Sequence, residues 1–231
     1  MRKRNKILAC ALAAAIFIAT GVGAKVMATS ETGDSTKQTD TETTKLTKTQ
    51  EESLKKIKAA YDVKNQDKIA EELEEKKSSQ EYTLSNMLIE YNPFGTNTQS
   101  LYVYFNTDEP VSVAYTVHAE DPKIQDFNRT VYQEEAYQKE HEFQVIGLIP
   151  DMENKVTFFL TEEDGSTDTK EIVFEMGSLM GTEDVQLDTD VAGDASQLED
   201  GLYVVLGNDS TALDFMYYYD NNGTLRGEVP L

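Results

Sequence analysis

Two histidines are the side chains of this chain that could carry a proton near neutral pH or bind a metal through nitrogen. Neither His118 nor His141 has a cysteine or a second histidine at the short spacings of metal-binding motifs. His118 falls at the end of an expected strand and His141 just before another. We therefore expect both to be surface residues and assign neither a catalytic nor a metal-binding role.

The remaining candidate groups also lack the surroundings that chemistry requires. Three serines are considered as nucleophiles, and none lies in a nucleophile-elbow sequence: Ser85, Ser178 and Ser210. The sequence also contains no glycine-rich phosphate-binding motif. Asp188-Thr189-Asp190 with Asp194 has the acidic composition of a calcium loop but lacks the glycine and final glutamate of an EF-hand, which favours a solvated linker. The sequence assigns no catalytic, cofactor-binding or metal-binding residue and no cofactor.

Three Asn-x-Ser/Thr sequences match the acceptor site for N-linked glycosylation, beginning at Asn128, Asn208 and Asn222. The first residues of the chain have the style of a bacterial leader, so we interpret these matches as coincidental.

The charge of the chain excludes one class of partner. It carries 21 basic and 42 acidic residues, for a formal net charge of −21, and the first 28 residues hold five of the basic groups. Such a surface repels phosphate backbones, so nucleic-acid binding is excluded. The only cysteine, Cys10, lies in the same first segment, which leaves the rest of the chain without a disulfide or a thiolate nucleophile.

Residues 1–28 have the pattern of an export signal. A basic start precedes an apolar run over residues 7–24, and Val26-Met27-Ala28 offers a small-residue cleavage site. The run is also long enough to span a bilayer if it is not cut. The segment predicts a signal peptide or membrane anchor that engages the export machinery, and an exported protein that is either secreted or anchored by residues 7–24.

The next two segments are expected to separate this leader from a folded domain. Residues 29–50 are almost wholly polar and predict a disordered linker. Strong helix formers follow over 51–80, with Thr49 as the expected N-cap. Leu54, Ile57 and Tyr61 give only a narrow apolar stripe, which favours a solvated spacer helix over a dimerising one.

Alternating apolar residues predict an immunoglobulin or fibronectin-III-like β-sandwich over 82–178. Strands are expected at 101–105 and 111–117, separated by a turn at Asp108-Glu109-Pro110. The most regular stretch is 140–174, where Gly147-Leu148-Ile149-Pro150 interrupts two alternating sets. The chain is therefore predicted to be mainly β.

An acidic linker is expected over 179–200, followed by three strands over 201–231. Asp220-Asn221-Asn222-Gly223 predicts a tight hairpin turn, because these residues tolerate positive φ. Three short apolar strands cannot bury both of their faces alone. We therefore predict that this C-terminal piece belongs to a larger sheet.

Several of these features resemble bacterial arylsulfate sulfotransferases. The stretch Tyr91-Asn92-Pro93-Phe94-Gly95, the two strands after it, and Gly147-Leu148 before Asn154-Lys155-Val156-Thr157 resemble the N-terminal immunoglobulin-like domain of that family. Residues 201–229 resemble the opening strands of the six-bladed propeller that follows in it.

The resemblance implies transfer of sulfate from a phenolic sulfate ester to another phenol through a sulfated histidine. The family's catalytic histidines and arginine lie in the propeller, and none of them can be placed on a residue of this chain. We expect an N-terminal portion, truncated before the catalytic region and inactive alone, whose partner is its own missing propeller or a separately encoded one, with homo-oligomers also open. The alternative is a cell-surface immunoglobulin-like binding or adhesion module.

Overall fold

The computed structural model describes residues 46–188, 190, 193–194, 197, 199, 201–207 and 213–231. The predicted leader and residues 29–45 of the predicted disordered linker lie outside these residues. The last three residues of that linker, 48–50, are helical, so its predicted end at 50 is wrong. Within them, no helix has the length and apolar character needed to cross a membrane. The fold is mainly β with an immunoglobulin-like sandwich, as the sequence predicted.

The predicted spacer helix 51–80 consists of two helices, α1 (Lys48–Ala60) and α2 (Val63–Ser79). Thr47, and not Thr49, caps α1 in a reciprocal capping box with Gln50. The chain breaks at Tyr61 because Asp62 takes an extended conformation and its carboxylate accepts the N–H of Asn65 at 2.8 Å, which starts α2. One N-cap aspartate therefore divides the helical segment.

Neither helix is solvated on all sides, so the interpretation of this segment as a solvated spacer is wrong. Leu73 of α2 is buried against four aromatic and aliphatic side chains of the sandwich: Tyr82, Leu88, Tyr102 and Tyr104. Lys77 extends over the Tyr104 ring, 4.8 Å from its centroid, and donates to Glu142 of the sandwich at 2.8 Å. Of the predicted apolar stripe, Ile57 is buried at 5% exposed, whereas Tyr61 is 57% exposed.

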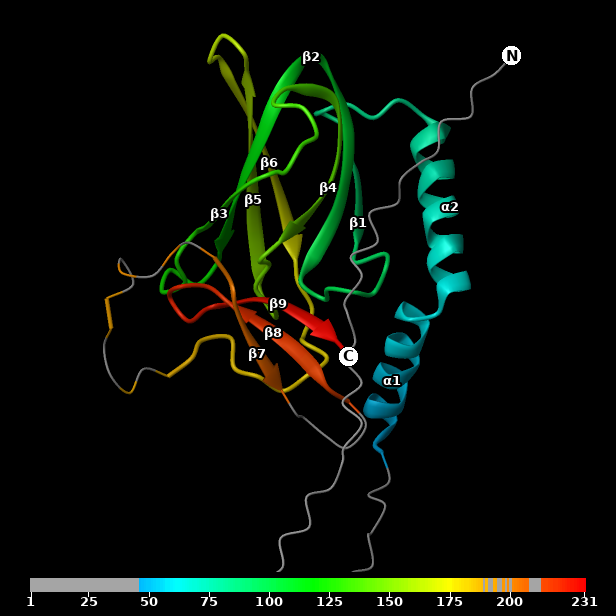
Figure 1. Cartoon of the computed structure of the whole chain (residues 1–231), viewed down its shortest axis with the longest axis vertical. Helices are drawn as coiled ribbons and strands as arrows, with labels where there is room; N and C mark the ends of the chain where they lie inside the picture. The colour runs from blue at the N-terminus through cyan, green and yellow to red at the C-terminus, as the bar shows by residue number, and fades with distance from the viewer. Residues whose placement is uncertain are drawn as a thin grey trace, which may run out of the picture. The chain divides into compact units, whose positions relative to one another are not determined.

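One long strand organises the sandwich (Figure 1). β2 (Ser100–Ala119) pairs over its first half with β1 (Leu88–Tyr91) and β4 (Gln138–Ile146), and over its second half with β3 (Phe127–Thr130) and β5 (Glu153–Glu162). β6 (Thr167–Glu175) completes the second layer by pairing with β5. β2 therefore belongs to both layers of the sandwich.

Two separate strands with a turn at 108–110 were expected where β2 runs without a break. The register shifts between Asn106 and Val111, at a position where Pro110 has no N–H to donate to a ladder. The irregularity passes the strand from one layer to the other. The predicted alternation holds in the second half, where Val113, Tyr115 and Val117 are buried.

The core lies between the two layers. Phe143 of β4 meets Phe158 of β5 edge-on with ring centroids 6.1 Å apart, and these two strands do not pair with each other. The contact therefore crosses the sandwich. The buried aromatic and aliphatic side chains around it come from every strand of β2 to β5 and from the corner after β4.

The corner between β4 and β5 explains the Gly-Leu-x-Pro stretch. Gly147 has a φ of +91°, and a Cβ there would lie 2.4 Å from the Phe127 ring. Asn154, fully buried at the start of β5, accepts from the N–H of Ile149 at 2.7 Å and donates to its carbonyl at 2.9 Å. These two bonds join Asn154 to the upstream backbone and fix the corner.

The C-terminal strands form a separate antiparallel sheet in the order β7 (Tyr203–Gly207), β8 (Phe215–Tyr219), β9 (Leu225–Pro230). The predicted turn joins β8 to β9, with Gly223 at a φ of +71°. Ile57 of α1 packs against one face of this sheet, on Phe215, Tyr217 and Tyr219. Part of the apolar surface that we expected a larger sheet to cover is covered by α1.

Candidate functional site

His141 is not a surface residue, and the prediction made for it is wrong. It lies inside β4 with none of its side chain exposed, on the inward face that it shares with Val145. Its ring stacks on Phe105 with centroids 4.8 Å apart. No substrate in solution can reach this imidazole.

The hydrogen bonds of His141 define its tautomer. The amide nitrogen of Gln133 can only donate, so it donates to Nδ1 of His141 at 3.3 Å. The proton of the neutral ring is therefore on Nε2 of His141, which donates to Thr107 Oγ1 at 3.2 Å. Thr107 in turn donates to the carbonyl of Glu109, in the irregular part of β2. Burial lowers the pKa of His141 to about 4, so the ring is neutral at pH 7 and acts as a structural link.

His118 lies on the surface, as predicted, near the end of β2. Its Nδ1 is 2.6 Å from Asp126 Oδ1, and about half of each side chain is exposed. An exposed imidazole paired with one carboxylate is a common surface arrangement. His118 is on the surface near the end of β2, whereas His141 is buried inside β4. The structure does not bring them together as a catalytic pair.

The other sequence candidates within the described residues make local hydrogen bonds. Ser85 bonds to the Thr83 hydroxyl, which is not a base, and Ser178 donates to the Asp151 carboxylate on the exposed surface without a histidine in the contact. Ser210 and the sequence that begins at Asn208 lie outside the described residues. Asn128 is the second residue of β3 and accepts from Thr116, while Thr224 is buried and donates to Gln186.

Acidic residues of the predicted linker line a cavity of about 960 Å³. Asp188, Asp190 and Asp194 face it together with Asp121 and Lys123 of the loop between β2 and β3. Among the described residues, no three His, Cys, Asp or Glu side chains are arranged to hold a metal ion. A cavity with this excess of carboxylates repels anions, including sulfate esters.

Arg226 of β9, which the sequence did not single out, is a buried polar group with several hydrogen-bond partners. Its side chain is fully buried, its Nε donates to Asp220 Oδ2 at 2.8 Å, and its Nη2 donates to the carbonyl of Gln125 at 2.6 Å. Nη1 lies 3.4 Å from the carbonyl of Gly147, and the guanidinium stacks over the Phe127 ring. Burial lowers the pKa of Arg226, and the charge of Asp220 counteracts that effect.

Glu228, two residues further along β9, makes the second connection to the sandwich. Its buried carboxylate accepts from the Thr98 hydroxyl at 2.7 Å and from the N–H groups of Met180 and Gly181 at 2.9 and 2.8 Å. Its backbone carbonyl accepts from the N–H of Thr98 at 2.9 Å. Glu228 thus binds β9 to Thr98 in the loop before β2 and to the backbone at Met180 and Gly181.

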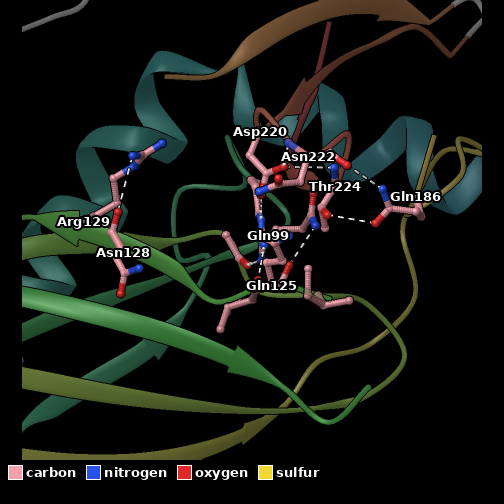
Figure 2. A network of polar contacts seen from close by, with 12 residues as sticks. Gln99, Gln125, Asn128, Arg129, Gln186, Asp220, Asn222 and Thr224 are labelled. Carbon is pink, nitrogen blue, oxygen red and sulfur yellow. Dashed lines mark hydrogen bonds and ion pairs between the residues drawn. The ribbon is translucent and has the colours of Figure 1, made fainter. Parts of the chain in front are cut away.

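The turn between β8 and β9 holds Asp220 in place to accept from Arg226. Figure 2 shows Asp220, Asn222, Thr224 and Gln186 around this turn. Asp220 accepts from the N–H groups of Asn222 and Thr224, and Gln186 bonds to the carbonyl of Asn222 and the hydroxyl of Thr224. One carboxylate therefore orders the turn and also neutralises the guanidinium. We call this cluster, formed by Arg226, Asp220, Glu228 and their partners, the β9 junction.

The β9 junction is built for positioning and not for turnover. An arginine can bind a sulfate group, but Arg226 is fully buried, and its Nε, Nη1 and Nη2 each donate to Asp220 or to a carbonyl of the sandwich. What the arrangement can do is hold the C-terminal sheet at one orientation against the sandwich.

Comparison with known families fits this arrangement. Residues 88–177 match the family described as the arylsulfotransferase Ig-like domain. The chain carries an arylsulfotransferase Ig-like domain. The match extends from β1 to the residue after Met176, so the arylsulfotransferase domain is the sandwich, and the two helices and the C-terminal sheet lie outside it. No curated protein matches the chain.

The resemblance drawn from the sequence is confirmed for this segment. Two of the stretches that carried it have structural roles: Gly147 and Asn154 form the corner between β4 and β5, and the turn at Asn92 to Gly95 contacts the helices. Gln66 of α2 donates to the carbonyl of Phe94 at 2.9 Å, and a Cβ on Gly95 would lie 3.1 Å from Ala60.

Proposed function

We propose that this chain is the N-terminal, positioning portion of an arylsulfate sulfotransferase that acts outside the cytoplasm, and that it does not transfer sulfate itself. The reaction implied by the family moves sulfate from a phenolic ester to another phenol. The proposal places this chemistry in a catalytic portion that this chain joins as a partner.

One observation carries the proposal: the buried groups best suited to sulfate chemistry are committed to structure. A histidine nucleophile must be reachable, whereas His141 is fully buried and stacked on Phe105. An arginine that binds sulfate must have open donors, whereas Arg226 bonds to Asp220, Gln125 and Gly147. The acidic cavity offers no attraction to an anionic ester.

Export rests on the sequence alone. The basic start and the apolar run over 7–24 support delivery across a membrane, with the chain released or anchored there. The absence of cysteine beyond Cys10 is compatible with an oxidising compartment.

The test is a sulfate-transfer assay with the purified chain, a chromogenic aryl sulfate as donor and a phenol as acceptor. No release of the chromophore above the enzyme-free rate is expected. A complete arylsulfate sulfotransferase serves as the positive control. Turnover by this chain would overturn the proposal.

A second function, a cell-surface binding or adhesion module, is favoured by the packing of Ile57 on Phe215 and Tyr217, which helps to make a self-contained body. Mixing the chain with a separately expressed arylsulfotransferase propeller distinguishes the two proposed functions. The positioning portion should co-elute with it in size-exclusion chromatography, whereas an independent binding module should elute alone.

A further inference from the structure

The outer edge of β7 is the one exposed strand edge in the described residues that carries no charged residue. β1 contains Glu90, β3 contains Arg129, and β4 and β6 each contain several charged side chains. β7 reads Tyr-Val-Val-Leu-Gly. Edge strands in soluble proteins are normally protected by charge, because unpaired N–H and C=O groups otherwise recruit another strand.

The side chains of β7 are also unusually exposed. Tyr203, Val204, Val205 and Leu206 are 44%, 53%, 40% and 72% exposed, so four consecutive apolar residues face solvent on both sides of the strand. Among the described residues β7 pairs with β8 alone. The apolar surface and the unpaired backbone edge therefore coincide.

The opposite edge of the same sheet is already occupied. The N–H of Thr98 donates to the carbonyl of Glu228, the N–H of Leu225 to that of Val185, and the N–H of Leu187 to that of Gly223. The sheet can therefore be extended at β7 and not at β9.

The acidic residues near β7 determine which kind of polypeptide strand can pair with its edge. The chain has a net charge of −21, and exposed acidic residues stand near both ends of β7. Glu199 precedes the strand, and Asp214 precedes Phe215, the partner of Gly207. Two copies paired edge to edge would bring like charges together, whereas a strand with basic ends would be attracted.

We propose that β7 binds, by strand addition, an extended polypeptide segment of about five apolar residues with lysine or arginine at its ends. Backbone hydrogen bonds would supply affinity, and the acidic surroundings would select the basic ends. The inference stands apart from the proposed function, since it concerns a binding edge and not sulfate transfer.

The experiment measures binding of fluorescent peptides to the purified chain by anisotropy. One peptide has five β-branched or aromatic residues between two lysine pairs, a second has glutamate pairs in their place, and a third has proline at its centre. The lysine peptide should bind at least about tenfold more tightly than either other peptide. Its advantage over the glutamate peptide should shrink as salt rises.

Variants locate the binding edge. Val204→Lys and Leu206→Lys place a charge on the exposed strand and should weaken binding of the lysine peptide at least about tenfold. Val173→Lys on the edge strand β6, where Val173 is 59% exposed, is the matched control and should leave it unchanged. Bound peptide should also slow hydrogen exchange at the β7 amides that point away from β8.

Three outcomes would overturn the proposal. They are the absence of peptide binding, equal binding to the Val204→Lys variant, and a dimer in sedimentation that Val204→Lys abolishes. The last would make a second copy of the chain the occupant. Thermal unfolding of each variant close to that of the parent verifies that the fold is intact.

Discussion

Arg226 and Asp220 form a buried ion pair across the β8–β9 turn, with Nε and Oδ2 2.8 Å apart and side chains that are 0% and 10% exposed. The same guanidinium reaches two carbonyls of the sandwich, so the turn and the Ig-like domain are fixed by one side chain.

Replacing Arg226 should therefore destabilise the whole folded body. Arg226→Ala leaves Asp220 as a buried charge without its cation and is expected to cost about 3–5 kcal/mol in the free energy of unfolding. Arg226→Lys keeps the charge but cannot contact all three partners, so a smaller loss is expected. Urea unfolding followed by circular dichroism measures both.

The control for that experiment is an exposed ion pair. Lys155 and Glu171 are 3.3 Å apart, with about half of each side chain in solvent. Lys155→Ala should cost less than about 1 kcal/mol. Equal losses for Lys155→Ala and Arg226→Ala would contradict the role given to the β9 junction.

His141 predicts a loss of stability in mild acid. Its pKa is about 4 in the folded chain and 6.5 ordinarily, so between these values the unfolded chain binds more protons and stability falls as the pH falls. The full effect, reached near pH 4, is of the order of 3 kcal/mol. His141→Gln should be less stable at pH 7 and show a shallower fall between pH 6.5 and 4.

The measurement is the urea midpoint of the parent chain and of His141→Gln across this pH range. The difference between the two proteins isolates His141 from the groups that they share. His118→Gln removes an exposed histidine instead, and the fall seen in the parent is expected to persist. An unchanged pH dependence in His141→Gln would refute the burial of a neutral imidazole.

A comparison of alanine variants at two glycines distinguishes the cost of a steric clash from the cost of a left-handed backbone conformation. Gly147 and Gly165 have φ values of +91° and +88°, but an added Cβ meets the Phe127 ring at 2.4 Å in the first and nothing within 4 Å in the second. Gly165→Ala should cost about 1–2 kcal/mol from the left-handed conformation alone. Gly147→Ala should cost about 2 kcal/mol more, because Phe127 must move. Similar melting temperatures for the two variants would show that the corner is not closely packed.

The helices can be tested as structural parts of the body. Ile57→Ala removes a 5% exposed side chain from the apolar cluster on β8 and should cost about 2–4 kcal/mol. Val63→Ala, at a position 72% exposed, should change stability by less than about 0.5 kcal/mol. A solvated spacer would give equally small changes at both positions, measured by thermal or urea unfolding.

Local patterns predicted the parts of this fold that depend on neighbours in sequence. The regular alternation within residues 140–174 placed β5, and the turn residues from Asp220 to Gly223 placed the β8–β9 hairpin. Gly147 marked a break because a positive φ requires it.

What the sequence did not indicate depends on distant partners. Arg226 and Glu228 are buried because Thr98, Gln125 and Gly147, far back in the chain, supply their hydrogen bonds. A strand that contains an arginine and a glutamate otherwise suggests an exposed edge. His141 did carry a usable signal, since it precedes Phe143 and Val145 at the spacing of one strand face.

The central claim is that this arylsulfotransferase Ig-like domain and its attached sheet position a catalytic portion without reacting with sulfate. The most direct measurement incubates the purified chain with an aryl sulfate donor, follows release of the phenol, and analyses the protein by intact mass spectrometry. The account predicts no phenol release above background and no sulfate adduct on His118 or His141. Phenol release together with a sulfated histidine would contradict it.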